Sequence, residues 1–241
     1  MSVSISKQFS DYAEIYDELF SATMDYKKEV DFYDKILRKN KVKKILEVGC
    51  GTGNRGKYFI DKGYDYTGLD ISEGMLNIAR RKYPELRFMQ GDVRNLSLNE
   101  SFDAVIFLGA GSAYLTTDDD ALSALRSMKK QVSKGVIIID GFYADFIIPN
   151  FKKNISWSKK IGSMTITRKS VNQLNPKYKN TWNRKLTYIV KDEGEKEKKY
   201  TDTAVLRAFS GKELKKLFAT AGITSTQIIR NGDTVIAIGT V

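Results

Sequence analysis

The sequence contains no histidine and only one cysteine, Cys50. A single cysteine excludes an internal disulfide and any metal site built from several thiolates. The absence of histidine removes the most common general base and the most common transition-metal ligand. Chemistry carried out by this chain would therefore depend on carboxylates, tyrosines, lysines or the positioning of substrates.

Long hydrophobic runs are also absent. No apolar run reaches the roughly 18 residues that a membrane helix needs, and residues 1–4 lack the charged-then-apolar profile of a signal peptide. We therefore expect a cytoplasmic protein without membrane partners. A length of 241 residues suits one α/β domain with an insertion or a small cap.

The charge balance is strongly basic, with 40 Lys and Arg against 29 Asp and Glu and a net charge of +11. The basic residues are scattered, and the denser pairs, such as Lys152-Lys153, alternate with acids. This pattern favours a solvated surface rich in lysine and glutamate. RNA binding is the alternative that the charge leaves open.

Strand and helix patterns alternate along the first part of the chain. Apolar residues at helical spacing cover residues 9–40. Alternation of strands with helices predicts a parallel sheet covered on both faces. The Asn231-Gly232 turn predicts a final hairpin, which makes the last strand antiparallel to its neighbour. The predicted strands span residues 44–48, 66–70, 86–90, 104–108, 136–140, 225–230 and 234–240, and the predicted helices span residues 54–62, 73–82, 118–132 and 211–221.

The pattern changes after Pro149. Strand-like alternation in residues 164–208, separated by charged turns, predicts a small antiparallel insertion. We divide the chain into one domain of residues 1–149 and 209–241, with an N-terminal helical lid at residues 9–40, and an insertion of residues 150–208. The insertion is interpreted as a substrate cap or a dimer contact, so a homodimer is a second expectation.

A glycine-rich turn follows the first predicted strand, in the run Ile45-Leu46-Glu47-Val48-Gly49-Cys50-Gly51-Thr52-Gly53, and Asp70 ends the second strand. Glycines let the backbone approach a ligand closely, because a Cβ would collide with it. An acid at the tip of the second strand can accept hydrogen bonds from both ribose hydroxyls. The unit therefore predicts a site for an adenine nucleoside.

The residues around this turn discriminate between a dinucleotide such as NAD and an adenine nucleoside that carries a cationic amino group. The run of residues 51–56 also fits the dinucleotide pattern GxGxxG. A buried Glu47 beside a pyrophosphate would be repulsive, whereas it can meet a cationic amino group directly or through water. Asp92 follows the third predicted strand, where it can accept from the adenine amine. An NAD-linked reductase is therefore the weaker hypothesis.

The motifs at residues 47–53, at Asp70 and at Gly91-Asp92 resemble, in this order, those of class I S-adenosylmethionine-dependent methyltransferases. The resemblance covers about residues 9–141 and the final hairpin. It implies a Rossmann-like, seven-stranded, mostly parallel sheet with an antiparallel last strand and helices on both faces. It also implies S-adenosylmethionine as the cofactor and no metal. The cofactor-binding residues that it implies are Tyr12, Tyr16, Glu47, Gly49, Gly51, Asp70, Ile71, Met75, Asp92, Val93, Arg94 and Leu108.

The opening Asp11-Tyr12, Tyr16-Asp17 and Asp25-Tyr26 pairs resemble those of small-molecule N-methyltransferases, including enzymes that methylate amino sugars and glycine-type amines. This implies in-line transfer of a methyl group to a small-molecule amine, with Tyr12 and Tyr26 positioning the acceptor. A neutral amine needs no catalytic base. The missing histidine is a departure, because some relatives place one near the acceptor.

Three other functions are compatible with parts of the sequence. An RNA methyltransferase is the main alternative, but residues 108–111 read Leu-Gly-Ala-Gly rather than the Asn/Asp-Pro-Pro-aromatic turn of many amino-methylating nucleic-acid enzymes. A non-catalytic cofactor-binding protein and the NAD-linked reductase are the others. We also expect Trp157 and Trp182 to pack in a core or interface, and Cys50 not to act as a nucleophile.

Overall fold

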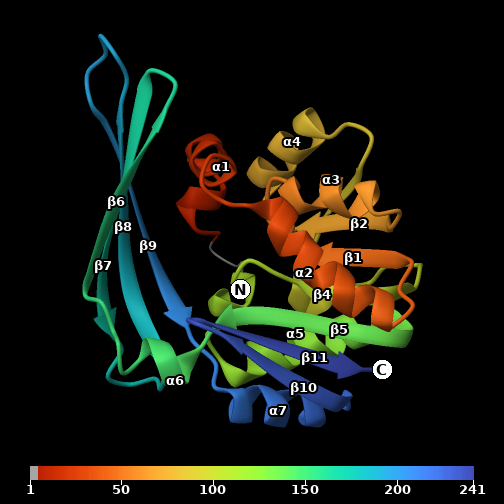
Figure 1. Cartoon of the computed structure of the whole chain (residues 1–241). Coiled ribbons are helices and arrows are strands. Elements are labelled where there is room, and N and C mark those ends of the chain that lie inside the picture. Colours follow the sequence, from red (N-terminus) through yellow and green to blue (C-terminus); the bar gives the residue numbers. More distant parts are fainter. Residues whose placement is uncertain (1–4) are drawn as a thin grey trace.

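The computed structural model describes residues 5–241, which form two separate sheets (Figure 1). The larger sheet has seven strands in the order β10-β11-β5-β4-β1-β2-β3. Every neighbouring pair is parallel except those of β11, which is antiparallel to both β5 and β10. The predicted fold class is confirmed. The strands are β1 Lys44–Val48, β2 Asp65–Asp70, β3 Arg87–Gln90, β4 Phe102–Phe107, β5 Val132–Phe142, β10 Thr224–Asn231 and β11 Thr234–Thr240.

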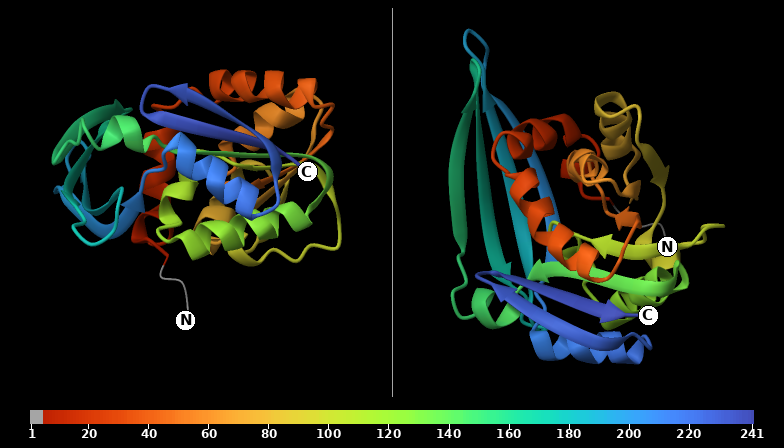
Figure 2. Two further views of the ribbon diagram at one scale, coloured as in Figure 1. Left: turned by 90° about the horizontal axis from the view of Figure 1, so that it is seen from below. Right: turned by 45° about the vertical axis from the view of Figure 1, so that its right-hand side comes forward.

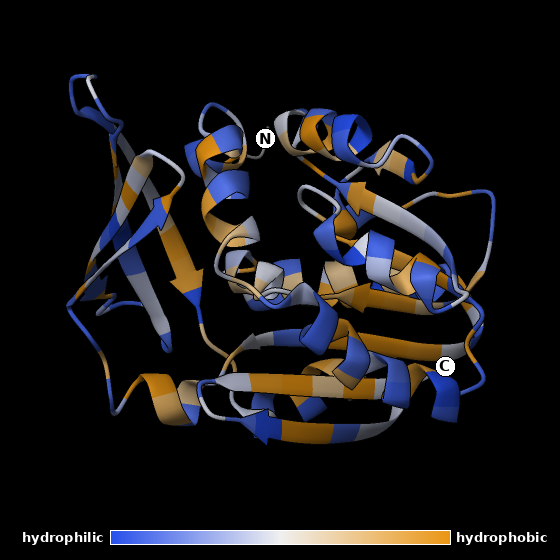
Figure 3. Ribbon diagram, turned by 45° about the horizontal axis from the view of Figure 1, so that its top comes forward, coloured by the Kyte–Doolittle hydropathy of each residue, from blue (hydrophilic) through white to orange (hydrophobic). Residues whose placement is uncertain are grey.

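Helices cover both faces of this sheet. Successive side chains along a strand point to opposite faces, and both faces here are apolar, so each must be covered. Leu46 of β1 belongs to the core cluster under α5 and α7, and its neighbour Ile45 belongs to the cluster under α2 and α3. Figure 3 shows the resulting hydrophobic strands between helices with hydrophilic outer faces. The helices are α1 Ala13–Ser21, α2 Tyr26–Lys39, α3 Asn54–Asp61, α4 Glu73–Lys82, α5 Asp118–Lys130, α6 Ala144–Ile147 and α7 Gly211–Thr220, with single 3₁₀ turns η1 Lys7–Phe9, η2 Val93–Asn95 and η3 Gly111–Tyr114.

The N-terminal helical stretch is divided in two. Asp25 begins α2 as its N-cap, and its side chain accepts a hydrogen bond of 2.9 Å from the backbone N–H of Lys28. Ser72 and Ser210 cap α4 and α7 as the sequence predicts, and Ser210 forms a complete capping box with Glu213.

The second sheet is the antiparallel insertion, ordered β6-β7-β8-β9. Its inner face packs on α1, where Leu19 meets Ile166, Leu186 and Tyr188. Its base packs on η3 and α6 through Trp182, so the sheet stands beside the main domain, next to α1 (Figures 1 and 2). The strands are β6 Asn154–Ile161, β7 Met164–Leu174, β8 Thr181–Lys191 and β9 Lys198–Arg207.

None of the helices in residues 5–241 is long and apolar enough to cross a bilayer.

Candidate functional site

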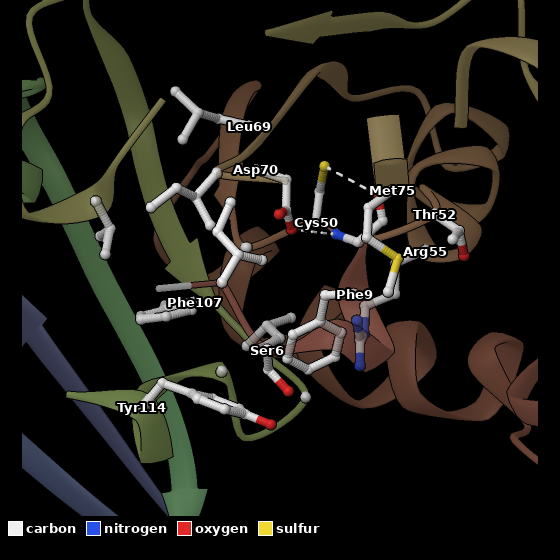
Figure 4. Close-up of a pocket in the computed structure, with 18 of the residues that line it drawn as sticks. Ser6, Phe9, Cys50, Thr52, Arg55, Leu69, Asp70, Met75, Phe107 and Tyr114 are labelled. Carbon is white, nitrogen blue, oxygen red and sulfur yellow. Dashed lines mark hydrogen bonds between the residues drawn. The ribbon is translucent and has the colours of Figure 1, made fainter. Parts of the chain in front are cut away.

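A pocket of about 320 Å³ opens at the carboxyl ends of β1, β2 and β4, under the N-terminal segment (Figure 4). Its volume falls in the range of small-molecule binding sites. Parallel strands place the loops that follow them at one edge of the sheet, so motifs far apart in sequence meet here. The sequence-predicted residues that line the pocket are Tyr16, Tyr26, Gly49, Gly51, Asp70, Ile71, Met75, Asp92, Val93, Arg94 and Leu108.

The glycine-rich loop forms one wall, and its glycines have different reasons to be there. Gly49 has φ of +66°, and a Cβ at this position would lie 2.6 Å from the ring of Phe107. Gly51 has φ of +57°, but a Cβ built on it would have no atom within 4 Å. Gly49 therefore has to be glycine because a side chain would collide with Phe107, whereas the free space beside Gly51 is part of the pocket.

Asp70 connects this loop to the end of β2. Its Oδ2 accepts from the N–H of Gly51 at 2.8 Å, and its Oδ1 accepts from the N–H of Ser72 at 2.8 Å. Burial raises the pKa of Asp70, and these backbone hydrogen bonds oppose the rise. The side chain lines the pocket (Figure 4). A carboxylate has more lone pairs than these two bonds use, so Asp70 can still accept from two ligand hydroxyls.

Asp92 is held by Arg94 two residues later. Nε of Arg94 lies 3.0 Å from Oδ1 of Asp92, and its Nη2 lies 2.6 Å from Oδ2. Arg94 also reaches Asp120 on α5 at 3.0 Å. Burial acts to raise the pKa of Asp92, but the bonds from Arg94 outweigh it and lower the pKa. Asp92 is therefore an oriented, ionised acceptor on the pocket wall.

Glu47, which the sequence predicts to meet a cationic amino group of the cofactor directly or through water, is not among the residues that line the pocket. It is fully buried, and it accepts from the hydroxyl of Tyr66 at 2.6 Å and from Nη1 of Arg55 at 3.4 Å. Burial raises its pKa to about 7, against the opposing effects of Arg55 and Tyr66. Arg55 is the neighbour that faces the pocket.

Arg55 is a pocket residue that the sequence reasoning missed. Its Nη2 bonds Glu29 at 3.0 Å, and its guanidinium lies 5.4 Å from the ring centre of Tyr26. Its Nε is buried without a hydrogen-bond partner in residues 5–241. The sequence does carry a signal for Arg55. It lies in the first turn of α3, where a positive charge is unfavourable unless acidic side chains pair with it.

Tyr12 also lies outside the pocket. Its ring packs edge-on against Tyr200 of β9, with centroids 5.1 Å apart. The structure therefore gives Tyr12 a packing role between the N-terminal segment and the insertion. Tyr16 and Tyr26 do line the pocket, and burial raises the pKa of each hydroxyl, so both are neutral donors at physiological pH.

The N-terminal segment closes the pocket through contacts that the sequence does not reveal. Ser72 donates to the carbonyl of Phe9, whose ring lines the pocket. Asp17 of α1 accepts from Thr52 of the glycine loop at 2.5 Å and from Lys82 of α4 at 2.8 Å. The segment is thus attached to the ligand-binding loops themselves.

The turn after β4 is fixed in an unusual conformation. Gly109 and Ala110 both have positive φ, of 74° and 58°. Their N–H groups donate to the carboxylate of Asp140 at 3.0 and 2.7 Å, and the hydroxyl of Tyr33 donates to the same carboxylate at 2.9 Å. Asp140 is therefore structural, and it holds the backbone at the end of the pocket that Leu108 and Gly109 line.

Within residues 5–241, no group of three or more Cys, Asp or Glu side chains could hold a metal ion.

Burial raises the pKa of the Cys50 thiol well above its ordinary value, which makes it a poor nucleophile. Trp182 packs against Phe142 and Phe151, and Trp157 packs against Phe20, as expected.

Comparison with known proteins agrees with this geometry. Residues 45–135 match the family described as "Methyltransferase domain". Residues 45–135 are thus similar to a methyltransferase domain. The match begins in β1 and ends in β5, so it includes the glycine loop, Asp70, Asp92 and the turn after β4. The resemblance identified from the sequence is confirmed at this level.

Curated relatives extend the likeness. The chain is 30% identical over 132 residues to a dTDP-3-amino-3,4,6-trideoxy-alpha-D-glucopyranose N,N-dimethyltransferase of Streptomyces venezuelae, covering 54% of this chain and 56% of the relative. It is 32% identical over 146 residues to a dTDP-4-amino-2,3,4,6-tetradeoxy-D-glucose N,N-dimethyltransferase of Saccharopolyspora spinosa, covering 58% and 59%. The chain thus spans little more than half the length of these relatives.

Among solved structures, DesVI of Streptomyces venezuelae superimposes with a TM-score of 0.85 at 23% identity, over 99% of both chains. The shared architecture therefore covers 99% of this chain and includes the second sheet.

Proposed function

We propose that this protein is an S-adenosylmethionine-dependent N-methyltransferase whose acceptor is a small-molecule amine of the amino-sugar class. The observation that carries the proposal is the convergence of Gly51, Asp70 and the Leu108–Gly109 turn on one pocket. Gly51 lets the backbone approach the cofactor closely, Asp70 can accept hydrogen bonds from its hydroxyl groups, and the Leu108–Gly109 turn forms a fixed end wall. The family match and the two amino-sugar relatives support the same activity.

The pocket residues fit this cofactor. Asp70 would bind the ribose hydroxyls beside the open space at Gly51, and Asp92 would accept from the adenine amine. At the other end, the unpartnered Nε of Arg55 is a donor for the carboxylate of the methionine part. Glu47 would then act through Arg55, by holding its guanidinium, rather than by touching the cofactor.

S-adenosylmethionine supplies an activated methyl group on a sulfonium centre when it is bound. The task of the chain is to align a nucleophile with that group and to exclude water. The Gly109–Ala110 turn, fixed by Asp140, forms the rigid end of the pocket. Phe9 covers the opening, and the neutral hydroxyls of Tyr16 and Tyr26 can orient an amine without taking its proton. A neutral amine acceptor requires no further group, which agrees with a chain that has no histidine.

Calorimetry with S-adenosylhomocysteine and with NAD tests the cofactor assignment. We expect S-adenosylhomocysteine to bind and NAD not to bind. NAD binding without S-adenosylhomocysteine binding would overturn the proposal in favour of a reductase. Turnover is tested with a dTDP-linked amino sugar and with the matched sugar that carries a hydroxyl in place of the amine. Methylation of the amine but not of the hydroxyl is expected, and methylation of the hydroxyl alone would overturn the assignment to nitrogen.

Action in the cytoplasm and assembly as a homodimer stay predictions of the sequence.

A further inference from the structure

The net positive charge of the chain is concentrated in the insertion. Residues 150–208 hold 15 Lys and Arg against 5 Asp and Glu, whereas the rest of the chain holds 25 against 24. Although basic residues are scattered along the sequence, almost the whole net charge of +11 therefore belongs to one small sheet and its turns. Such an asymmetry between two parts of a chain indicates an anionic partner for the charged part.

The two faces of the insertion sheet differ in chemistry. The inner face contains the buried side chains of Ile166 and Leu186 and packs on α1. Side chains alternate along a strand, so the residues between these positions form the outer face, which is turned away from the main domain (Figure 1). In strands β6 to β9 the outer face presents Ser, Thr, Asn and Gln side chains and no Asp or Glu. Its exposed lysines are Lys160, Lys169, Lys185, Lys191 and Lys199.

Strand register spreads these lysines along the outer face. Pairing between the strands orders the outer-face residues in rows that run across the sheet. Four successive rows each contain at least one lysine: Lys160 and Lys191 in the first, then Lys199, Lys169 and Lys185 in turn. Neighbouring rows are two residues apart along a strand, so the lysines extend over about 20 Å of the face. The charges therefore form a continuous basic surface.

The fold itself does not neutralise this surface. Within residues 5–241, Lys199 alone of the five lysines forms an ion pair, with Glu197 at 3.1 Å. Four of the five acids of the insertion lie in the turn between β8 and β9, and the fifth, Asp202, is buried on the inner face. Exposed lysines of α2 and α3, by contrast, pair with acids one helical turn away. The outer-face lysines are therefore available to an anionic partner.

The residue types of the outer face suit a nucleic-acid backbone. Lys, Ser, Thr, Asn and Gln are side chains that contact phosphates and sugars in nucleic-acid complexes. Protein interfaces are depleted in Lys and enriched in aromatic residues, and the outer face of the four strands presents no aromatic side chain. Single strands are held by stacking of their bases on aromatic rings, so the same composition favours a duplex.

We propose that the outer face of the insertion sheet binds the backbone of double-stranded RNA. Duplex RNA is recognised mostly by its shape, its phosphates and its 2′-hydroxyls, which a flat face of lysines, hydroxyls and amides can contact. DNA readers, in contrast, place a helix or a two-stranded ribbon in the major groove. The sheet and α1 lie between the outer face and the pocket, so the RNA is a partner and not the methyl acceptor.

Fluorescence anisotropy with a labelled RNA duplex of about 20 base pairs tests this surface. We expect the wild-type protein to bind it with an affinity that falls about 100-fold between about 50 and 200 mM salt, as about four phosphate contacts require. The triple variant Lys160→Gln, Lys169→Gln and Lys185→Gln should bind about 100-fold more weakly or less, with a salt slope smaller by about three. Single-stranded RNA and a DNA duplex of the same sequence should bind less tightly than the RNA duplex.

A second triple variant with the same change in net charge is the matched control. Lys212→Gln, Lys215→Gln and Lys216→Gln remove three exposed lysines from α7 of the main domain. Because exposed charges far from the bound RNA are screened by salt, the control should bind within about threefold of the wild-type protein. Thermal unfolding of both triple variants shows that they fold.

Several results would overturn the RNA surface. Equal weakening in the two triple variants would show that only overall charge matters. Absence of RNA binding by the wild-type protein, tighter binding of the single strand or the DNA duplex, or binding of phosphatidylserine vesicles in place of RNA would each exclude duplex RNA as the partner. Sedimentation of a wild-type dimer that dissociates in the outer-face variant would make this face a contact between copies of the chain. S-adenosylhomocysteine affinity should be the same in all three proteins, so the RNA surface and the proposed function fail separately.

Discussion

The hydroxyl of Tyr66 donates a 2.6 Å hydrogen bond to Oε2 of Glu47, and both side chains are buried behind the glycine-rich loop. Burial raises the pKa of Glu47 to about 7, from an ordinary value of 4.5. The native protein therefore binds this proton more tightly than the unfolded chain does. The stabilisation from protonated Glu47 is fully present below pH 4.5 and is lost as the pH rises through about 7.

This titration predicts how stability changes with pH. The free energy of unfolding should fall between pH 5 and pH 8, with ~3 kcal/mol of the fall due to Glu47. Glu47→Gln cannot titrate, so its stability should fall less over the same interval. Urea unfolding of both proteins at the two pH values measures the difference. Glu85→Gln, at an exposed position, is the control and should behave like the wild-type protein. An identical fall in wild type and Glu47→Gln would show that Glu47 is already ionised.

Asp70 should control cofactor affinity. In Asp70→Asn the ribose hydroxyls lose a charged acceptor worth about 1.5–3 kcal/mol, so the affinity for S-adenosylhomocysteine should fall about 10- to 100-fold. Calorimetry measures this directly. Asp65→Asn is the matched control, because Asp65 begins the same strand and its side chain is 67% exposed. Equal affinity in the Asp65 and Asp70 variants would remove Asp70 from the binding site.

Two glycines allow backbone strain to be separated from ligand contact. Gly51 and Gly63 both have positive φ, of 57° and 87°, and a Cβ on either would have no atom within 4 Å. Gly51→Ala and Gly63→Ala should each lose about 1–2 kcal/mol of stability from the left-handed conformation. Only Gly51→Ala should also lose cofactor affinity, by about tenfold or more, or about 1.4 kcal/mol.

Thermal unfolding and S-adenosylhomocysteine titration of the two glycine variants give both quantities. If Gly63→Ala weakened binding as much as Gly51→Ala did, the effect would be general strain and the open space at Gly51 would not be the ligand site.

Arg55 should be important for folding as well as for binding. At pH 8, where Glu47 is largely ionised, Arg55→Met takes the cation away from buried Glu47 and half-buried Glu29, which should cost about 3–5 kcal/mol. Replacing Glu47 by Gln in the same protein removes one of the uncompensated charges, so part of the stability should return. Urea unfolding of the wild-type, single and double variants forms a double-mutant cycle. Additive effects in this cycle would contradict the coupling of Arg55 and Glu47 that the structure shows.

The fold was largely predictable because its signals are local. Strands of the main sheet show apolar patterns bounded by turns, and Ser72 and Ser210 mark helix starts with cap chemistry. The strand β6 was missed because its inner face is only weakly marked: six of its eight residues are exposed, and only Trp157 and Ile161 are partly covered.

A place on the pocket wall was predictable only where it follows from position after a strand end, as for Asp70 and Asp92. Tyr12 and Glu47 were expected to face the ligand, but their orientation depends on partners distant in sequence. The ring of Tyr12 packs against Tyr200, and Glu47 contacts Arg55, which is the residue of the two that lines the pocket. The contact between Ser72 and the carbonyl of Phe9 is tertiary in the same sense, since nothing in the first ten residues indicates where that segment packs.

Transfer of a labelled methyl group from S-adenosylmethionine tests the central claim most directly. The acceptors are a dTDP-linked amino sugar and total RNA, offered separately to the wild-type protein and to Asp70→Asn. The account predicts label on the nitrogen of the amino sugar, none in RNA, and a strongly reduced rate with Asp70→Asn. Label in RNA with none in the amino sugar would contradict it.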